Sequence, residues 1–349
     1  MPIEARRVYR LSLTVALALV GSYALQLPMP FLAPLFAFVL AAAPAPPIGP
    51  KGLLALILVI LITLGGGLVL VPLLAHYTAV ALVIVALGLF FSNLLTVNLG
   101  QALFGTFLTI GFTLISAAGL ASYQLATTVI QALVLGIALT IISLWVVYPW
   151  FPEDAPAEKK EGGAHSTGET SMWIAARAAI IVFPAYLMAL YNPQVYMPIV
   201  MKAVSLGQQG SVRGARHAGR ELLGSTFLGG CFAVLFWFAL KMFPSLWMFF
   251  LWMLLFALYF ASKQYGLLAS RFPASFWQNT AVTLLILLGP AVEDSANGKD
   301  VYMAFVVRMA LIIAVTLYAW LAIRVLEQWR LRRVDRSISF PGTAEAPRC

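Results

Sequence analysis

The chain has 349 residues; hydrophobic types make up 62% of them, and only 10% are Asp, Glu, Lys or Arg. Soluble globular proteins carry roughly 25% charged residues, so this composition excludes a soluble enzyme, a disordered chain and a coiled coil. Because a spanning helix needs about 20 apolar residues, the length and the mean hydropathy of +0.92 predict an all-α polytopic membrane protein with about twelve transmembrane helices.

The apolar runs are continuous rather than alternating, which predicts spanning helices. Six of them precede residue 150, at about 8–27, 31–47, 52–74, 77–97, 100–120 and 123–149. A polar stretch from Glu153 to Ser171 follows and predicts a linker. Six more runs fall at about 173–191, 194–209, 219–242, 245–263, 274–291 and 301–326.

The formal net charge is +9, and the Lys and Arg residues behind it divide unequally between the two sides of the membrane. With the N-terminus inside, twelve crossings put every Lys and Arg except Lys241, Lys299 and Arg308 on the inner side, as the positive-inside rule requires. Both termini are therefore expected to be cytoplasmic. Nucleic acid is not an expected partner, because the chain has no basic-aromatic module. The partner expected from composition is the lipid bilayer.

Two groups of residues suggest an internal repeat. Residues 28–32 (Pro-Met-Pro-Phe-Leu) align with residues 193–197, and residues 64–67 (Leu-Gly-Gly-Gly) align with residues 228–231, at nearly the same offset. The alternative is chance alignment of the Pro and Gly that membrane helices often contain. Because six is even, two repeats of six spans would be parallel, an arrangement that some transporters use.

The expected organisation is a first six-helix transmembrane repeat at 1–150, a cytoplasmic linker at 151–171, a second six-helix repeat at 172–330 and a cytoplasmic tail at 331–349. Prolines crowd the second span and the start of the eighth. Since proline removes a backbone donor, it predicts short, Pro-broken helices at matching places in the two halves. Such helices are a pointer to a transport site, although kinking for packing is the alternative.

Arg308 lies inside the last predicted span, where an ionisable side chain is costly and therefore a functional candidate. A guanidinium there would bind a carboxylate bidentately or, as structure, would only fix the preceding loop. Glu293, Asp294 and Asp300 are candidates to neutralise it and to couple transport to protons. The repeat places Gln131, polar but uncharged, roughly opposite.

Lys202 lies just past Pro198 and either snorkels inward or draws an anion into a cavity. On the inner side, Arg213, Arg216 and Arg220 share one helical face, which is typical of an anchor for anionic lipid and alternatively forms a cytoplasmic entrance for an acidic substrate. Glu221, beside Arg220, is a further carboxylate for proton coupling.

A polar stripe follows Asn98 and Gln101 along the fifth span, and Thr109 is its central member. Small hydroxyl residues often only pack helices together, and a lined substrate pathway is the alternative. Phe31 and Tyr196 stand at matched repeat positions beside Pro and are candidates to stack on a substrate ring.

Enzyme chemistry is not expected. The three histidines, His76, His165 and His217, have no metal-ligand or triad spacing, and no glycine-rich phosphate loop appears. Neither Cys231 nor Cys349 has a metal-ligand spacing. No metal or cofactor is therefore predicted, and uphill transport would have to draw on an ion gradient or on a partner.

The opening basic helix at 6–10, the segment from Leu25 to Pro34 and the last span from Tyr302 to Arg308 carry a family resemblance. Together with the doubled six-span plan, the chain resembles the short, membrane-only members of the fusaric-acid-resistance and aromatic-acid exporter superfamily. The resemblance implies efflux of aromatic carboxylic acids or similar amphipathic compounds and drugs across a bacterial inner membrane, driven by protons. It also implies a periplasmic membrane-fusion adaptor and, through it, an outer-membrane channel. Homo-oligomers are compatible with it.

The expected function is thus that of an inner-membrane efflux transporter component exporting organic anions along a path between the two six-helix halves. A major-facilitator permease shares twelve spans and inner termini, but residues 46–51 do not resemble the Gly- and Arg-rich loop usual in that class. A non-transporting membrane scaffold that recruits an adaptor protein is the alternative from another class.

Overall fold

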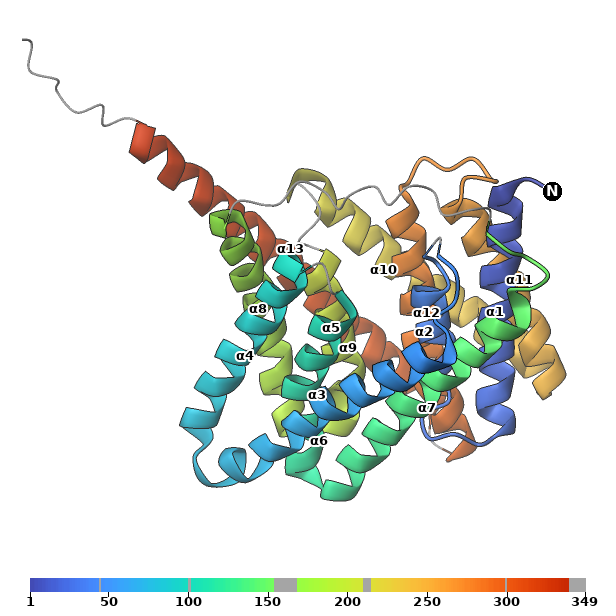
Figure 1. Cartoon of the computed structure of the whole chain (residues 1–349), viewed down its shortest axis with the longest axis horizontal. Helices are drawn as coiled ribbons and strands as arrows, with labels where there is room; N and C mark the ends of the chain where they lie inside the picture. The colour runs from blue at the N-terminus through green and yellow to red at the C-terminus, as the bar shows by residue number, and fades with distance from the viewer. Residues whose placement is uncertain (44, 100–101, 154–167, 210–214, 299, 339–349) are drawn as a thin grey trace, which may run out of the picture.

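Long apolar helices form the described part of the chain. The structure is a computed structural model that describes all residues except 44, 100–101, 154–167, 210–214, 299 and 339–349 (Figure 1). Its first half contains α1 (Ile3–Ala24), α2 (Leu32–Leu40), α3 (Pro50–His76), α4 (Thr78–Leu99), α5 (Ala102–Ile110), the π-helix η1 (Gly111–Ile115), α6 (Ser116–Ala121) and α7 (Tyr123–Val147). Its second half contains α8 (Gly168–Tyr191), α9 (Pro193–Gln209), α10 (Ala215–Met242), α11 (Leu246–Gln264), α12 (Ala274–Ala296) and α13 (Val301–Ile338).

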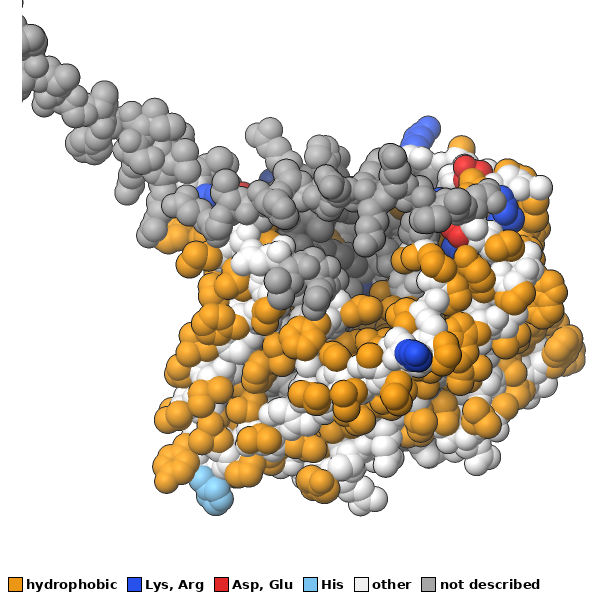
Figure 2. Space-filling model, viewed as in Figure 1, with side chains coloured by type: hydrophobic (Ala, Val, Ile, Leu, Met, Phe, Trp, Pro, Cys, Tyr) orange, Lys and Arg blue, Asp and Glu red, His pale blue; other side chains and the backbone are white. Residues whose placement is uncertain are grey.

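The all-helical prediction is confirmed. Within the described residues nine helices are long and apolar enough to cross a membrane, and apolar side chains such as Leu58, Ile62 and Val83 are exposed on α3 and α4. In a space-filling view the flanks are mostly hydrophobic, while most charged side chains gather along the edge where the N-terminus lies (Figure 2). Water would not tolerate so wide an apolar surface. The chain is a multi-pass membrane protein.

Several predicted boundaries were wrong. The second span was expected at 31–47, but α2 ends at Leu40, before the prolines that follow. In the second half α9 is also short, at 17 residues, and Pro198 lies inside it without ending it. The last helix was expected to end near 326, with a tail from 331, and instead continues to Ile338. Most of the linker lies outside the described residues.

The fifth span is distorted where the sequence showed only an apolar run. After Ile110 the chain forms the π-helix η1 and then returns to an α-helix at Ser116. π-Helical turns are rare and occur frequently at functional sites. The corresponding helix of the second half, α12, contains Pro290 instead. Among the nine described helices that could span a membrane, these two are the most enclosed, with 67% and 83% of their most apolar stretches buried, against 28% for α3.

Helix contacts follow one pattern in both halves when the six helical spans of each are matched in order. α1 packs along α11, and its counterpart α8 packs along α4. α2 packs on α7 as α9 packs on α13, and α3 packs on the fifth span as α10 packs on α12. This is the pattern expected of two parallel repeats whose first helices each pack against the other half. The domain boundaries themselves stay a prediction.

Two faces follow from this arrangement. The face that carries the start of α1 and the end of α7 is called the N-terminal face, and the side that carries the α3–α4 turn and the α12–α13 turn is called the opposite face (Figure 1). α2 and α9 both run from the opposite face toward the N-terminal face, in the centre of the molecule. Both helices lie between the two halves, and the candidate site is built around them.

Candidate functional site

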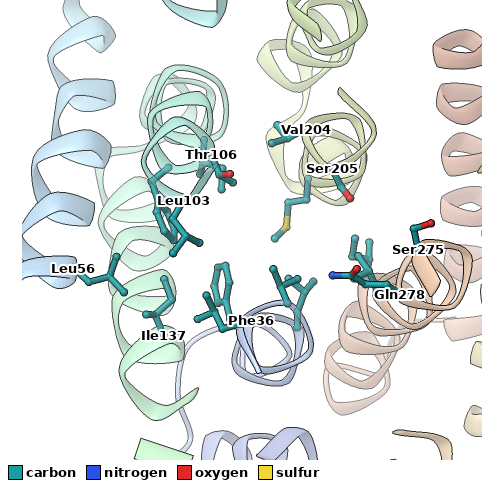
Figure 3. Close-up of a pocket in the computed structure, with 17 residues that line it drawn as sticks. Phe36, Leu56, Leu103, Thr106, Ile137, Val204, Ser205, Ser275 and Gln278 are labelled. Carbon is teal, nitrogen blue, oxygen red and sulfur yellow. The ribbon is translucent and has the colours of Figure 1, made fainter. Parts of the chain in front are cut away.

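A cavity of about 310 Å³ lies toward the N-terminal face, and we call it the N-side cavity (Figure 3). Its volume is at the lower end of the range that accommodates drug-sized ligands. The wall comes from α2, α3, α5 and α7 of the first half and from α9 and α12 of the second. It is mainly apolar, with a few polar side chains that include Thr106 and Gln278, and it therefore suits an amphipathic ring compound. Its lining residues are Leu35, Phe36, Val39, Leu40, Leu56, Leu103, Thr106, Phe107, Ile110, Ile137, Met201, Val204, Ser205, Ser275, Gln278, Val282 and Ile286.

A second cavity of about 240 Å³, the far-side cavity, lies toward the opposite face. Its wall also comes from both halves: the segment leading into α2, η1 and α7 from the first, and α9, α12 and α13 from the second. Charged side chains stand in this wall, whereas the described residues that line the N-side cavity are uncharged. Its lining residues are Met29, Phe31, Leu32, Leu114, Leu125, Val129, Leu133, Met197, Pro198, Met201, Pro290, Glu293, Asp294, Asn297 and Arg308.

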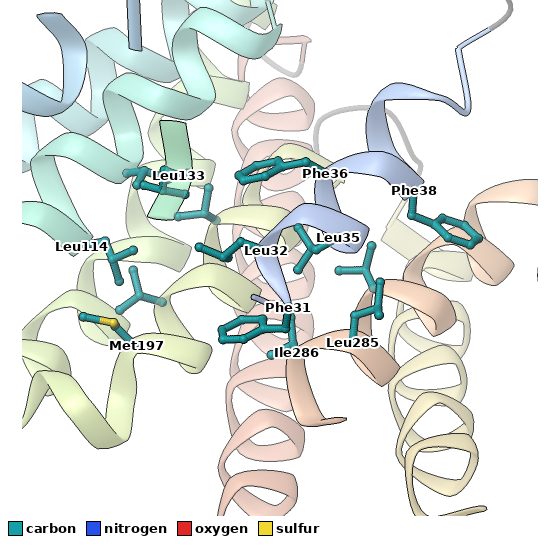
Figure 4. Close-up of a cluster of buried hydrophobic side chains, with 14 of the residues drawn as sticks. Phe31, Leu32, Leu35, Phe36, Phe38, Leu114, Leu133, Met197, Leu285 and Ile286 are labelled. Carbon is teal, nitrogen blue, oxygen red and sulfur yellow. The ribbon is translucent and has the colours of Figure 1, made fainter. Parts of the chain in front are cut away.

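Apolar side chains separate the two cavities. On α2, Leu35 and Phe36 line the N-side cavity, whereas Leu32 lines the far-side cavity. The same division occurs on the other helices, and Met201 of α9 lines both cavities. Figure 4 shows the α2 side chains between Leu133 of α7 and Ile286 of α12. We call the separating side chains the apolar layer: Leu32, Leu35, Phe36, Leu133, Met201 and Ile286.

The start of α2 is packed tightly against the second half. A Cβ placed on Gly289 of α12 would lie 2.2 Å from Cγ of Phe31, so only glycine fits there. On the other side of α2, Thr140 of α7 donates a hydrogen bond of 2.8 Å to the carbonyl oxygen of Ala33. Met29, just before the helix, has a left-handed φ of 50°, an uncommon conformation for a residue with a side chain. The helix is thus held between the two halves.

The far-side cavity contains an ion pair. A guanidinium nitrogen of Arg308 lies 2.6 Å from a carboxylate oxygen of Asp294, and both side chains are mostly buried. Glu293, half-buried, lines the same cavity. Arg308 is therefore neutralised by Asp294, one of the partners considered from the sequence, while Asp300 instead accepts the backbone N–H groups of Tyr302 and Met303 at the start of α13.

Lys202 does not snorkel to a surface. Its side chain is fully buried between α9 and α12, where its ammonium donates hydrogen bonds of 2.7 Å to Oδ1 of Asn279 and to Oγ1 of Thr283. Asn279 in turn donates to Ser225 of α10. Among the described residues its hydrogen-bond partners are neutral. Lys202 is not in the cavity wall, although its neighbour Met201 lines both cavities.

Other predicted site residues lie elsewhere. Gln131 is exposed on α7, whose cavity-lining residues are its neighbours, and Asn98 is exposed near the end of α4. Tyr196 is half-buried and outside both walls, unlike Phe31. Thr109 is buried and bonds to Ser92 and to the carbonyl oxygen of Gly105, so it packs helices.

The predicted inner entrance is only partly described. Arg213 and Gln101 lie outside the described residues. The backbone of Arg216 and Arg220 belongs to the first turns of α10, and their side chains lie outside the description. Glu221, half-buried on the same helix, is not in either cavity wall.

Each half closes its first helix on its last span through a charged and aromatic contact. In the first half, Glu153 accepts hydrogen bonds from Arg7 and lies 2.8 Å from a guanidinium nitrogen of Arg10. Beside it, Tyr9 stacks on Phe151. We call this contact the first clamp.

The second clamp joins α8 to α13. Arg177 lies 2.9 Å from a carboxylate oxygen of Glu327, and Trp173 stacks on Trp329. The two clamps therefore use the same chemistry, although Glu153 and Phe151 lie past the end of α7 while Glu327 and Trp329 lie within α13.

Electrostatics fix the charge state of the first clamp. Burial acts to raise the pKa of the Glu153 carboxyl, but hydrogen bonds and charges from Arg7 and Arg10 outweigh it and hold that pKa below its ordinary value. Next to the clamp, burial raises the pKa of the Tyr265 phenol to about 12, and this hydroxyl donates to the carbonyl oxygen of Ala42 after α2. Near neutral pH the clamp therefore holds an ionised carboxylate beside a neutral phenol.

The lysine network and the π-helix were missed from the sequence. Asn279 and Thr283 form a polar pair one turn apart within an apolar span, which is a readable signal for a buried polar contact. The π-helix had no such signal. No group of three or more His, Cys, Asp or Glu side chains in the described part of the chain is placed to hold a metal ion.

Comparison with known proteins gives one match. A family model described as a protein of unknown function (DUF2955) matches residues 7–147, less than half of the chain. This description gives no activity and does not name the fusaric-acid-resistance superfamily. The matched segment begins in α1 and ends at the last residue of α7, so it coincides with the first half. Comparisons with curated proteins and with solved structures return no match.

Proposed function

We propose that this protein is a membrane transporter that moves amphipathic organic anions, aromatic carboxylates in particular, along a route between its two halves. The observation that carries the proposal is the pair of cavities on either side of the apolar layer, each lined by both halves. A membrane scaffold has no need for enclosed space in its centre. Substrate sites near the membrane midplane between repeats are typical of transporters.

The two cavities supply different parts of the recognition. The N-side cavity offers an apolar wall to a ring, with Gln278 in the wall to meet a polar substituent. The far-side cavity offers the guanidinium of Arg308, which matches a carboxylate in a planar, bidentate way. A substrate that carries a ring and a carboxylate would meet one and then the other as the apolar layer rearranges.

The direction of transport rests on charge and resemblance. Most Lys and Arg residues fall on the side of the N-terminus when the spans are counted, which supports cytoplasmic termini. The exporter resemblance supports outward movement across a bacterial inner membrane, with a periplasmic adaptor and an outer-membrane channel as partners. The carboxylates of the far-side cavity, Glu293 and Asp294, support coupling to protons.

Uptake and release of labelled 4-hydroxybenzoate by proteoliposomes tests the proposal. Arg308→Ala is expected to reduce the initial rate at least tenfold, because it removes the guanidinium that would bind the substrate carboxylate. A tenfold loss corresponds to about 1.4 kcal/mol of interaction. Gln131→Ala, on the exposed face of α7, is the matched control and keeps the rate. Wild-type liposomes that move no more label than empty ones would contradict the transport proposal. An unchanged rate in folded Arg308→Ala would remove this residue from it.

A further inference from the structure

We infer that the N-side cavity selects its ligand by a polar substituent: it holds a two-ring aromatic compound whose hydroxyl group bonds to Gln278, with Ser275 as the second partner. The inference rests on the proposed function, because it names the kind of aromatic compound that the route accepts. Its basis is a pair of polar side chains in one wall that make no hydrogen bond within the described part of the chain.

The neighbouring polar side chains of α12 have partners within the protein. Asn279 accepts a hydrogen bond from Lys202 and donates one to Ser225. Thr280 and Thr283 donate to carbonyl oxygens one turn earlier in the same helix. Such pairing is expected, because an unpaired polar group inside a membrane is costly. A polar side chain of this helix without a partner is therefore a candidate to meet a ligand.

Gln278 and Ser275 are such side chains. Both line the N-side cavity, and the amide of Gln278 extends into it without a hydrogen bond to any other described residue (Figure 3). The Ser275 hydroxyl, one turn earlier on the same face of α12, is buried and has no partner among the residues that the structure describes. Rotation about its Cα–Cβ bond turns this hydroxyl toward the cavity. The two side chains thus form one polar spot in an apolar wall.

A hydroxyl group matches this spot. The Gln278 amide offers both an N–H donor and a carbonyl acceptor, and the Ser275 hydroxyl can take either role. Because a ligand hydroxyl also donates and accepts, it can bond to both side chains at once. A methyl group of similar size would leave both of them unpaired. Sites built to bond a ligand hydroxyl discriminate strongly against analogues that lack it.

Aromatic side chains in the same cavity suit the rings of the ligand. Phe36 of α2 and Phe107 of α5 both line it and pack on each other, with ring centroids 6.1 Å apart and an interplanar angle of 45°. The Phe36 ring and the Gln278 amide extend into the same space, so a ligand can stack on Phe36 while its hydroxyl faces α12 (Figure 3). An apolar cavity of about 150 Å³ holds one benzene molecule. A volume of about 310 Å³ therefore has room for two fused rings with their substituents.

Calorimetry of the purified full-length protein tests the inference with two matched ligands, 6-hydroxy-2-naphthoate and 6-methyl-2-naphthoate. They have the same rings and the same carboxylate, so the ratio of their Kd values isolates the substituent. We expect the wild type to bind the hydroxyl compound about tenfold more tightly, because the methyl compound leaves the polar spot unpaired. The single-ring acid 4-hydroxybenzoate is expected to bind about tenfold more weakly than the hydroxynaphthoate, since it buries less apolar surface.

Variants locate the hydroxyl contact. Gln278→Leu together with Ser275→Ala replaces the polar spot by apolar side chains of similar size and is expected to bring the two naphthoates to nearly equal affinity. Where the double variant does not fold, Gln278→Leu alone is expected to reduce the ratio severalfold. Gln131→Leu, on the exposed face of α7, is the matched control and keeps the ratio of the wild type.

The outcomes separate this inference from the proposed function. Equal affinity of the wild type for the two naphthoates overturns the inference and leaves the proposed function standing. A hydroxyl preference that folded Gln278→Leu retains in full does the same, as does binding of 4-hydroxybenzoate as tight as that of the hydroxynaphthoate. Absence of binding by all three acids overturns the proposed function itself.

Discussion

The two halves of the molecule share an arrangement of helices but differ in the side chains that they place at the centre. Both fix their first helix to the end of their last span through an arginine–glutamate pair beside two stacked aromatic rings. Both bring a glycine-containing third span against the fifth: a Cβ on Gly67 would meet the carbonyl of Gly111, and one on Gly229 would meet the carbonyl of Thr280. These close contacts between small residues hold the third and fifth spans of each half at a short distance.

The difference lies in the lining of the centre. The charged residues of the far-side wall, Glu293, Asp294 and Arg308, come from the second half, as does Lys202, which is buried outside the walls. The first half contributes apolar and small polar side chains and the short helix α2. The repeat alignment matches Lys202 with the apolar pair at 37–38. Under the proposed function, the shared frame would allow either side to open, and the asymmetric lining would give the route its charge preference.

The largest expected effect concerns Lys202, the charge with no counterpart in the first half. Asn279→Leu removes one of its two acceptors and leaves a buried ammonium poorly solvated, because no carboxylate pairs with it among the described residues. We expect a loss of about 3 kcal/mol in the free energy of unfolding. Reversible unfolding in mixed micelles, followed by tryptophan fluorescence, measures it.

A paired variant sharpens this test. Lys202→Met with Asn279→Leu replaces the polar network by apolar side chains of similar size, so most of the lost stability is expected to return. Stability of Asn279→Leu equal to that of the wild type would show that Lys202 is satisfied by other means and is not a strained feature of the second half.

The features that the sequence predicts are local ones, and the features that it misses depend on contacts between distant residues. Spans, helix type and the candidate Arg308 follow from composition and from the cost of a charge in lipid, which are local properties. The contact of Phe31 with Gly289 joins residues far apart in the chain, so no periodicity shows it. Gln131 illustrates the limit: the offset that matches Lys202 with residues 37–38 places Arg308 opposite residues 143–144, so the repeat does not locate Gln131, which is exposed on α7.

The next prediction tests whether α2 is held by the second half. Gly289→Ala places a methyl group against the base of the Phe31 side chain, where a small shift of the ring cannot relieve the clash. We expect a loss of about 2 kcal/mol in unfolding free energy from overpacking. The added variant Phe31→Gly removes both the ring and the Cβ that the new methyl group would meet, so in the double variant the two losses are expected to be far from additive.

A glycine of the first half is the control for this substitution. Gly66→Ala in α3 meets nothing within 4 Å and is expected to stabilise the helix by about 0.5–1 kcal/mol. Additive losses for Gly289→Ala and Phe31→Gly, with Gly66→Ala behaving as expected, would mean that α2 does not pack on α12 in the membrane.

The smallest effect compares the two clamps. Glu153→Gln removes the negative charge that Arg7 and Arg10 share, and we expect a loss of about 1 kcal/mol in the free energy of unfolding near neutral pH.

The folded-state pKa of Glu153 is held below its ordinary value of 4.5, so the contribution of this carboxylate to stability is fully present above that value and is lost as the pH falls through the lower folded-state pKa. Unfolding free energies of wild type and Glu153→Gln should therefore differ at neutral pH and converge in strong acid. The corresponding Glu327→Gln in the second clamp removes the carboxylate that faces Arg177, and its loss at neutral pH is expected to be of similar size. A difference between wild type and Glu153→Gln that instead grew below the ordinary pKa would show that the carboxylate destabilises the clamp, and the likeness between the two halves would then be one of position without a shared energetic role.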